Sequence, residues 1–224
     1  MHELGIKVLF EGNNLERLAL SVVLVIKLSG ISLVLGLALG IIFGIIRTSK
    51  NWFVKLLFKI YLEIFRIVPL LVLLFVFYYI LPEMTDSSIS NEVVSVLVFV
   101  LWISAEMSDL VRSGIQNVSQ IQVESGKAIG FNQWQLYRYV LLPQGLKQVI
   151  PATINLVTRV IKTTSLLMLI GVAEMMRVGT QIIENYTVEQ PTVSLWIYGL
   201  IFCLYFMLCY PLARLATYLE KERV

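Results

Sequence analysis

Long apolar runs separated by short polar connections dominate the chain. A helix needs about 20 residues to cross the hydrocarbon core of a bilayer, at a rise of about 1.5 Å per residue. Five runs approach or exceed that length, at about residues 18–46, 56–81, 93–110, 149–176 and 193–218. The pattern predicts an all-α integral membrane protein with about five transmembrane helices, the first long enough to tilt or protrude.

Composition agrees with this prediction. The 224 residues are 58% hydrophobic and 15% charged, whereas soluble domains are about half apolar and about a quarter charged. The net charge of +3 would also suit nucleic acid, but the basic residues flank the apolar runs and form no patch. We therefore expect contact with membrane lipid and not with nucleic acid. The length allows one transmembrane domain, 1–224, with a core at about 17–218.

The basic residues of the connections alternate between the two sides of the membrane. Setting aside Lys7 and Arg17 near the N-terminus, eleven lie in the first and third connections and the C-terminal tail: Arg47, Lys50, Lys55, Lys59, Arg112, Lys127, Arg138, Lys147, Arg214, Lys221 and Arg223. The second and fourth connections contain only Arg177. Because Lys and Arg concentrate in cytoplasmic loops, we expect an outside N-terminus and a cytoplasmic C-terminus, in a multi-pass protein of a bacterial-type cytoplasmic membrane.

The chain lacks the residue patterns of common enzymes and metal sites. His2 is the only histidine, and Cys203 and Cys209 stand six residues apart in an apolar run, which suits buried thiols. No G-x-x-x-x-G-K-[ST] or H-E-x-x-H pattern occurs. We expect no catalytic site, no metal and no nucleotide bound by this chain. The N-terminal segment, with Glu3 and Glu11, is acidic and lacks a cleavage site, so the first span should be retained.

Small residues recur at four-residue steps along the first span, at Ser32, Gly36, Gly40 and Gly44. Such a stripe lets two helices approach closely in lipid, where no hydrophobic force drives them together. Glycine is also frequent in membrane helices in general, but the strict register favours close packing. The pattern leaves open whether the partner helix belongs to this chain or to another.

The connection at about 111–148 is long enough to fold. Residues 119–122, Ser-Gln-Ile-Gln, match a capping box that would open a helix, and Gly130 can close that helix with a left-handed cap. Asn132 offers a second cap, and Pro143 should end the second helix. We expect two short helices on the cytoplasmic side, which form either a docking surface or a loop lying on the lipid headgroups.

Glu124 is followed by Gly130 and, after nine residues, by Val140 and Leu142-Pro143. This arrangement resembles the EAA loop of ATP-binding-cassette (ABC) importer permeases, which reads E-A-A, three residues, G, nine residues, I, one residue, L-P. Serine and glycine replace its two alanines and valine its isoleucine. The resemblance implies a coupling helix that sits in a cleft of a separate ATPase subunit. Its residues would be Glu124, Ser125, Gly126, Lys127, Ala128, Ile129, Gly130 and Phe131.

Other segments resemble the polar amino acid branch of these permeases, so that the likeness covers nearly the whole chain. FRIVPLLV at 65–72 is similar to F-R-G-T-P-L-L-V, SDLVRSGIQ at 108–116 to S-E-I-F-R-G-G-I-Q, and IKTTSLL at 161–167 to I-K-D-T-S-L-V. Thr163 stands where the branch usually has Asp, and Val68 where Thr is common. The polar lining typical of the branch is therefore partly lost.

The resemblance also implies partners. These are ABC ATPase subunits that bind ATP and Mg, a second permease subunit in a homodimer or heterodimer, and an extracytoplasmic substrate-binding protein. The chain would then be a transport subunit without a cofactor of its own, and not an enzyme. ATP binding would close the ATPases and shift the helix bundle from inward-facing to outward-facing.

Seven ionisable residues lie inside the predicted spans or at their edges: Lys27, Glu63, Arg66, Glu106, Asp109, Arg159 and Lys162. Such residues normally face the bundle interior or a wet cavity. We predict a substrate path lined by Arg66, Pro69, Glu106, Thr163, Thr164 and Ser165. Arg66 would meet the carboxylate of an amino acid and Glu106 its ammonium, beside the helix break that Pro69 imposes. The structural alternative is an Arg66–Glu63 ion pair, or an Arg66 side chain that extends to the membrane surface.

Two other functions remain open at this stage. A permease of the same family could import a solute that is not an amino acid. A self-sufficient secondary transporter or channel would usually show two related halves, and no internal repeat is evident. The intramembrane charges have both signs, so acidic, basic and neutral amino acids are all compatible with the sequence.

Overall fold

The computed structural model describes residues 5–221, and His2, Glu3 and Arg223 lie outside this range. Every regular element within it is helical, as predicted. The elements are η1 (Gly5–Phe10), α1 (Asn14–Ile46), α2 (Trp52–Ile67), α3 (Leu70–Thr85), α4 (Asn91–Gln116), α5 (Gln120–Ala128), α6 (Gln133–Leu136), η2 (Tyr137–Leu141), α7 (Leu142–Gln148), α8 (Ile150–Thr163), η3 (Thr164–Ile170), α9 (Met175–Tyr186) and α10 (Val193–Lys221). Four helical segments can span a membrane, or five if the bent pair α2–α3 counts as one span.

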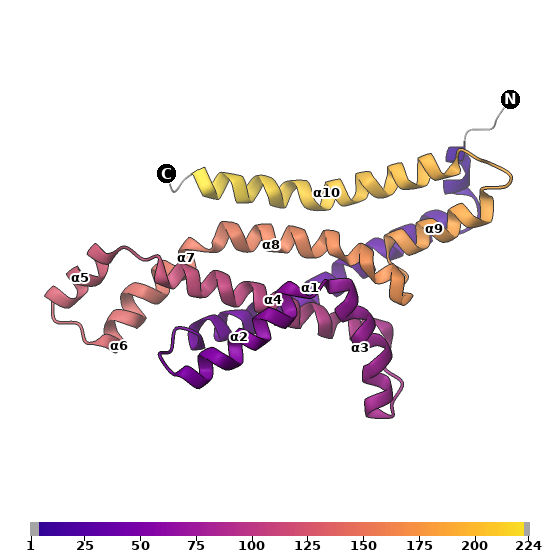
Figure 1. The fold of residues 1–224 in the computed structure, drawn as a ribbon. Coiled ribbons are helices and arrows are strands. Elements are labelled where there is room, and N and C mark those ends of the chain that lie inside the picture. Colours follow the sequence, from indigo (N-terminus) through magenta and orange to yellow (C-terminus); the bar gives the residue numbers. More distant parts are fainter. Residues whose placement is uncertain (1–4, 222–224) are drawn as a thin grey trace.

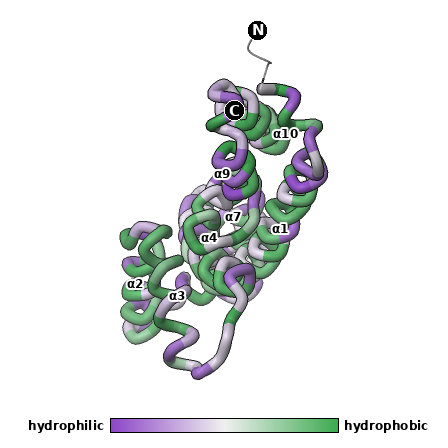
Figure 2. The backbone as a smooth tube through the Cα atoms, turned by 90° about the vertical axis from the view of Figure 1, so that its right-hand side faces the viewer, coloured by the Kyte–Doolittle hydropathy of each residue, from purple (hydrophilic) through white to green (hydrophobic). Residues whose placement is uncertain are grey.

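The long helices lie lengthwise in one elongated bundle (Figure 1). The segment that contains α5 and α6 lies at the same end of the bundle as the C-terminal end of α10, whereas η1 and the α9–α10 connection lie at the other. Seen along the bundle, α1 lies on one side of α4 and the pair α2–α3 on the other (Figure 2). Apolar side chains such as Val34, Leu195 and Phe202 remain exposed on the outer faces, as expected where lipid is the solvent.

The small-residue stripe of α1 packs against α4 of the same chain. The distances from a Cβ built on each glycine to the Cβ of its α4 neighbour are 2.7 Å for Gly36 and Ile103, 2.4 Å for Gly40 and Met107, and 2.5 Å for Gly44 and Val111. Real Cβ atoms do not approach so closely, so only glycine fits at these three positions. Both helices advance by four residues between contacts, so they run parallel in register. The predicted close packing is confirmed, and its partner is intramolecular.

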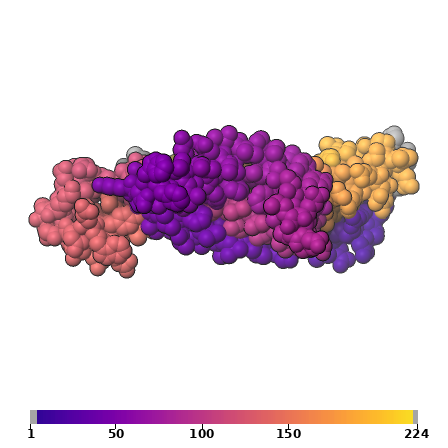
Figure 3. All heavy atoms as spheres, turned by 60° about the horizontal axis from the view of Figure 1, so that its bottom comes forward, coloured from indigo at the N-terminus to yellow at the C-terminus, as the bar shows by residue number. Residues whose placement is uncertain are grey.

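The second apolar run is not one straight crossing. Its two halves, α2 and α3, are bent by 103° relative to each other. Val68 between them has extended backbone, and Pro69 precedes the first residue of α3. Because proline has no N–H to donate and restricts the residue before it, the helix breaks at this point, as the sequence indicated. The run predicted as one span at 56–81 is therefore a bent pair of helices, which can still count as one broken span. Together the two helices cover one exposed face of the bundle (Figure 3).

The fourth apolar run also differs from the prediction of one span at 149–176. Helix α8 tightens into η3, which ends at Gly171 in the left-handed conformation (φ 85°). A separate helix, α9, then starts with Glu174 as its N-cap. The apolar run of the sequence continues across this boundary because α9 also carries core residues, namely Met175, Val178 and Ile182. The left-handed glycine and the cap, which are local features, end the span at Ile170.

We expect Gly40→Ala to destabilise the bundle, because its new Cβ would lie 2.4 Å from the Cβ of Met107. Overpacking of this kind reduces the free energy of unfolding by about 1–3 kcal/mol. Gly30→Ala on the same helix is the matched control, since no atom lies within 4 Å of the added carbon. Denaturant or thermal unfolding of the purified proteins in detergent checks this. Equal stability of the two variants would show that α1 and α4 are not in close contact.

Candidate functional site

The loop segment between α4 and α8 folds into a helical hairpin. Helix α5 ends in a Schellman motif, in which Gly130 has φ 87°, its N–H donates to the Lys127 carbonyl (3.0 Å), and the Phe131 N–H donates to the Gly126 carbonyl (3.0 Å). The predicted left-handed cap is confirmed. At the start of α5, Ser119 makes no side-chain capping bond. The predicted capping box is therefore wrong, because the Ser119 carbonyl, not its hydroxyl, accepts the N–H of Gln122 (3.0 Å).

The second half of the hairpin starts as predicted but continues further. Asn132 and Gln135 form a reciprocal capping box with two bonds of 2.9 Å. Pro143 does not end the helix, contrary to the prediction. The π-helical turn η2 precedes it, and the Leu142 N–H donates to the Tyr137 carbonyl five residues back. A wider turn relieves the clash between the proline ring and the preceding turn, so the helix runs on through α7.

The predicted coupling residues are accessible for docking, with one structural exception. Gly126 is buried, and a Cβ there would lie 2.7 Å from Cδ1 of Leu136, so the glycine lets α5 lie against α6. Phe131 is half-buried, and its ring lies 6.1 Å from that of Tyr139 at a tilt of 51°. The exposed members are Glu124, Ser125, Lys127, Ala128, Ile129 and Gly130. Ile129 is 72% exposed, and an exposed large apolar side chain on a polar loop suits a contact with another protein.

A backbone contact joins this loop to the bundle. A Cβ on Gly114 of α4 would lie 2.5 Å from the carbonyl oxygen of Gly145 in α7, and a Cβ on Gly145 would lie 2.7 Å from Cα of Ile115. The two helices therefore meet backbone to backbone at this point. The sequence does not reveal this glycine pair, because the two residues are 31 positions apart.

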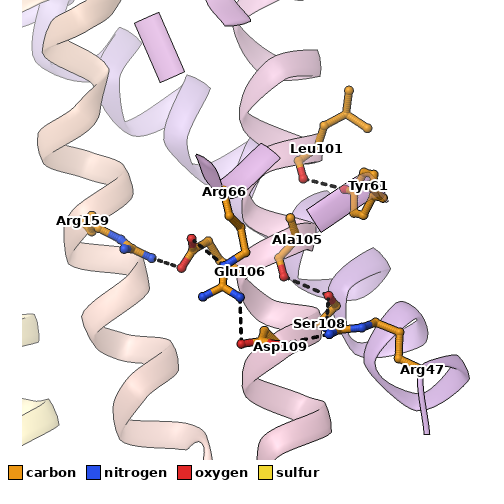
Figure 4. A network of polar contacts seen from close by, with 9 residues as sticks. All are labelled: Arg47, Tyr61, Arg66, Leu101, Ala105, Glu106, Ser108, Asp109 and Arg159. Atoms are coloured by element: carbon orange, nitrogen blue, oxygen red, sulfur yellow. Dashed lines mark hydrogen bonds and ion pairs between the residues drawn. The ribbon is translucent and has the colours of Figure 1, made fainter. Parts of the chain in front are cut away.

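Three arginines from three helices converge on two carboxylates of α4 (Figure 4). Arg66 of α2 lies 2.9 Å from Oδ2 of Asp109 and 3.6 Å from Oε1 of Glu106. Arg47 at the end of α1 lies 3.1 Å from Oδ1 of Asp109, and Arg159 of α8 pairs with Glu106. We call these five residues the charge network. With three cations and two anions it has a net charge of +1.

The alternative Arg66–Glu63 ion pair is not formed. Glu63 lies instead near Lys59 (3.8 Å), one turn back on α2. The carboxylates of α4 are closer to Arg66, and sequence spacing within α2 does not report them. Arg47 is the most buried cation of the network and also donates to the hydroxyl of Ser108 (3.0 Å). Burial lowers the pKa of Arg47 from its ordinary value, and the hydrogen bond and charge of Asp109 partly offset this effect.

Part of the charge network lines a cavity of about 370 Å³ between α2, α4 and α8. Its lining residues are Leu62, Glu63, Arg66, Ile67, Glu106 and Arg159. Arg159 also stacks over the Trp102 ring, with 5.3 Å between the guanidinium carbon and the ring centroid. Arg159 is one of the seven ionisable residues of the predicted spans, but it is not among the residues predicted to line the substrate path. The cavity combines two guanidinium groups with two carboxylates, which is a suitable set for a zwitterion.

The structure brings Arg66 and Glu106 together but does not bring the Thr163–Thr164–Ser165 segment to this cavity. Thr164 is buried, donates to the Ile161 carbonyl and lies 3.4 Å from the Tyr205 hydroxyl. Thr163 and Ser165 donate to carbonyls of their own helix. Pro69 lies at the α2–α3 break, two residues from the cavity residue Ile67. A path role for these residues remains a prediction.

One buried acid was not singled out by the sequence analysis. Glu174 is fully buried and accepts hydrogen bonds from the backbone N–H groups of Met176 (2.9 Å) and Arg177 (2.8 Å) and from the Tyr205 hydroxyl (3.2 Å). It caps α9 and joins it to α10. Its position directly before an amphipathic segment is the signal that could have identified it as a cap.

A family model described as the binding-protein-dependent transport system inner membrane component matches residues 36–223. The chain belongs to this family. The match confirms the resemblance to importer permeases that the loop motif indicated. The charge network and the hairpin are thus features of a membrane-spanning transport subunit, referred to below as the permease.

The permease is also similar to individual amino acid transport proteins and to a solved transporter structure. The permease is 30% identical over 187 residues to the inner membrane amino-acid ABC transporter permease protein YhdY of Escherichia coli K12. The aligned region covers 82% of this chain and 50% of that protein. It is 30% identical over 151 residues to the glutamine transport system permease protein GlnP of the same organism, with 67% and 69% covered. A crystal structure described as an amino acid ABC transporter with histidines has a TM-score of 0.82 at 25% identity, with 92% and 94% covered.

Asp109→Asn should destabilise the permease, because it leaves Arg47 and Arg66 without this carboxylate. Loss of one partner from a partly buried pair reduces the free energy of unfolding by about 2 kcal/mol, less than for a fully buried pair. The control is Glu92→Gln, which removes the exposed Lys27–Glu92 pair (3.4 Å) and should change stability by less than about 1 kcal/mol. Thermal unfolding in detergent measures both. A similar small change in both would mean that the network does not hold the helices together.

Proposed function

We propose that the permease translocates a polar amino acid, delivered by an extracytoplasmic binding protein and driven by separate ATPase subunits. The observation that carries the substrate class is the cavity in which Arg66 and Arg159 flank Glu106. The likeness to amino acid permeases in sequence and fold supports it. The volume of this cavity, about 370 Å³, lies within the range of pockets for small molecules.

The charges of the cavity complement those of an amino acid. A guanidinium can bind a carboxylate with two parallel hydrogen bonds, and a carboxylate accepts hydrogen bonds from an ammonium group. Within the chain, Glu106 is shared between Arg66 and Arg159. A substrate carboxylate that takes one arginine would release Glu106 to meet the substrate ammonium. In this exchange Glu106 and both charged groups of the substrate would keep a partner of opposite charge, which matters where the surroundings are apolar.

The distribution of basic residues supports an orientation and a location. We infer that the end of the bundle with α5, α6 and the C-terminus faces the cytoplasm of a bacterial-type cell, with the N-terminus outside. The exposed side of the hairpin then lies where a cytoplasmic ATPase can reach it. Arg66 and Arg159 are each about half exposed in the single chain. Because exposed charges are disfavoured in lipid, a second permease subunit, identical or related, would cover them.

The same geometry supports a coupling route. The ATPase would grip the hairpin around Gly130, and the Gly114–Gly145 contact would pass its movement to α4. Helix α4 carries Glu106 and Asp109, which hold Arg66 and Arg159. A shift of α4 would thus change which arginine each carboxylate pairs with. The ATPase would in this way alter the relative stability of two bundle conformations.

Arg66→Ala should reduce substrate uptake. A hydrogen-bonded charge contributes about 1.5–3 kcal/mol to binding, so we expect uptake to fall by about 10-fold to 100-fold. The measurement is ATP-driven uptake of labelled glutamine by liposomes that contain the complete transporter. The control is Lys50→Ala, which removes a charge from the exposed α1–α2 connection. Unchanged uptake by a correctly inserted Arg66→Ala variant would refute the assignment of Arg66.

Ile129→Asp should weaken the contact with the ATPase, because it places a charge on the exposed apolar side chain of the hairpin. Burying an unpaired charge opposes binding by several kcal/mol, so the ATPase should no longer co-purify with the permease. Val188→Asp is the control, since Val188 is equally apolar and 93% exposed in the α9–α10 connection at the opposite end. Retention of the ATPase by both variants would contradict the docking role. Solute accumulation by the permease alone, without an ATPase, would contradict the whole proposal.

A further inference from the structure

A second cavity, of about 380 Å³, lies between α1, α2 and α4 at the end of the bundle that carries the basic connections. We call it the basic cavity. Its lining residues are Arg47, Lys55, Phe58, Lys59, Leu62, Glu63 and Arg112. Four of the seven are cationic and one is acidic. The basic cavity adjoins the substrate cavity described above but contains neither Arg66 nor Arg159.

Only two of the four cations of the basic cavity have an acidic partner among residues 5–221. Glu63 lies near Lys59 (3.8 Å), and Arg47 is engaged with Asp109. The side chains of Lys55 and Arg112 form no hydrogen bond or ion pair with any residue in the range 5–221. The charge of Arg112 also acts on Arg47 and contributes to lowering its pKa. Like charges gathered in one cavity repel each other, and a bound anion would relieve this repulsion.

The exposed side of α2 is apolar. Its large apolar side chains follow the helix at three- and four-residue steps: Phe53, Leu57, Ile60 and Ile64. This stripe lies about 150° around the helix from Lys55 and Lys59, and the exposed side chains of Trp52 and Leu56 lie between them. Trp52, 73% exposed, stands at the first position of α2. Tryptophan at the end of a membrane helix is typical of the boundary between headgroups and acyl chains. Helix α2 therefore offers a polar site at the boundary and an apolar track leading into the membrane.

We propose that the basic cavity binds the phosphate-bearing headgroup of an anionic phospholipid, whose acyl chains pass Trp52 and Leu56 and reach the apolar stripe on the exposed side of α2. A phosphate carries the negative charge that would pair with Lys55 and Arg112. Guanidinium and ammonium groups both donate hydrogen bonds to phosphate. Basic pockets between membrane helices at the cytoplasmic surface are suited to such headgroups. Free phosphate shares the charge but has no group to occupy the apolar stripe. This site is independent of which solute the permease carries.

The test uses the purified permease–ATPase complex, titrated in detergent with phosphatidylglycerol or phosphatidylcholine and analysed by native mass spectrometry. We expect wild type to retain phosphatidylglycerol in preference to phosphatidylcholine. The double variant Lys55→Gln/Arg112→Gln should bind phosphatidylglycerol about 30-fold more weakly, since each basic group near a membrane surface contributes roughly a factor of five. The charge-conserving variant Lys55→Arg/Arg112→Lys should retain it, which separates loss of charge from loss of fold.

A matched control removes the same charge elsewhere at this end. Arg214→Gln/Lys221→Gln changes two cations of α10 that do not line the basic cavity, and it should bind phosphatidylglycerol as wild type does. Three results would overturn the proposal. They are equal loss in both double variants, no preference of wild type between the two lipids, and complete displacement of phosphatidylglycerol by an equal concentration of inorganic phosphate, which would assign the site to a free anion.

Discussion

The close approach of α1 and α4 is the contact on which the rest of the bundle depends. Apolar side chains gain nothing from leaving lipid for one another, so helices associate there through close van der Waals packing and polar contacts. The close packing comes from three glycines of α1, Gly36, Gly40 and Gly44. They leave room for three large α4 side chains to meet the α1 backbone. With α1 along one side of it, α4 is placed at the centre of the bundle.

From this position α4 organises the charged residues. Its two carboxylates receive arginines from α1, α2 and α8, and its backbone touches α7 at Gly114. Charges in an apolar surrounding are stable only when paired, so the arginines specify which helices lie next to α4. The same helix thus links the loop that would meet the ATPase to the cavity that would meet the substrate. Coupling over this distance requires only that α4 moves as one body.

Helix α2 has three sides with different contacts. One side packs on α4, where the Tyr61 hydroxyl donates to the Leu101 carbonyl (2.6 Å). A second side carries Lys55, Lys59 and Arg66 into the two polar cavities. The third is apolar and exposed. The break at Pro69 turns the chain away at 103°, so α2 does not have to be apolar all round as a full crossing helix would.

Sequence alone determined the features that depend on neighbours along the chain. Apolar run length predicted the membrane helices, the Gly130 and Asn132 caps were correct, and the loop spacing identified the family. Only the tertiary structure decided the partners of the glycine stripe and of Arg66. The π turn before Pro143 and the break between η3 and α9 are local features, which the pattern of apolar residues did not reveal. Caps and hydrophobic periodicity arise within a few residues, whereas ion pairs and helix contacts depend on distances in space, which sequence separation does not encode.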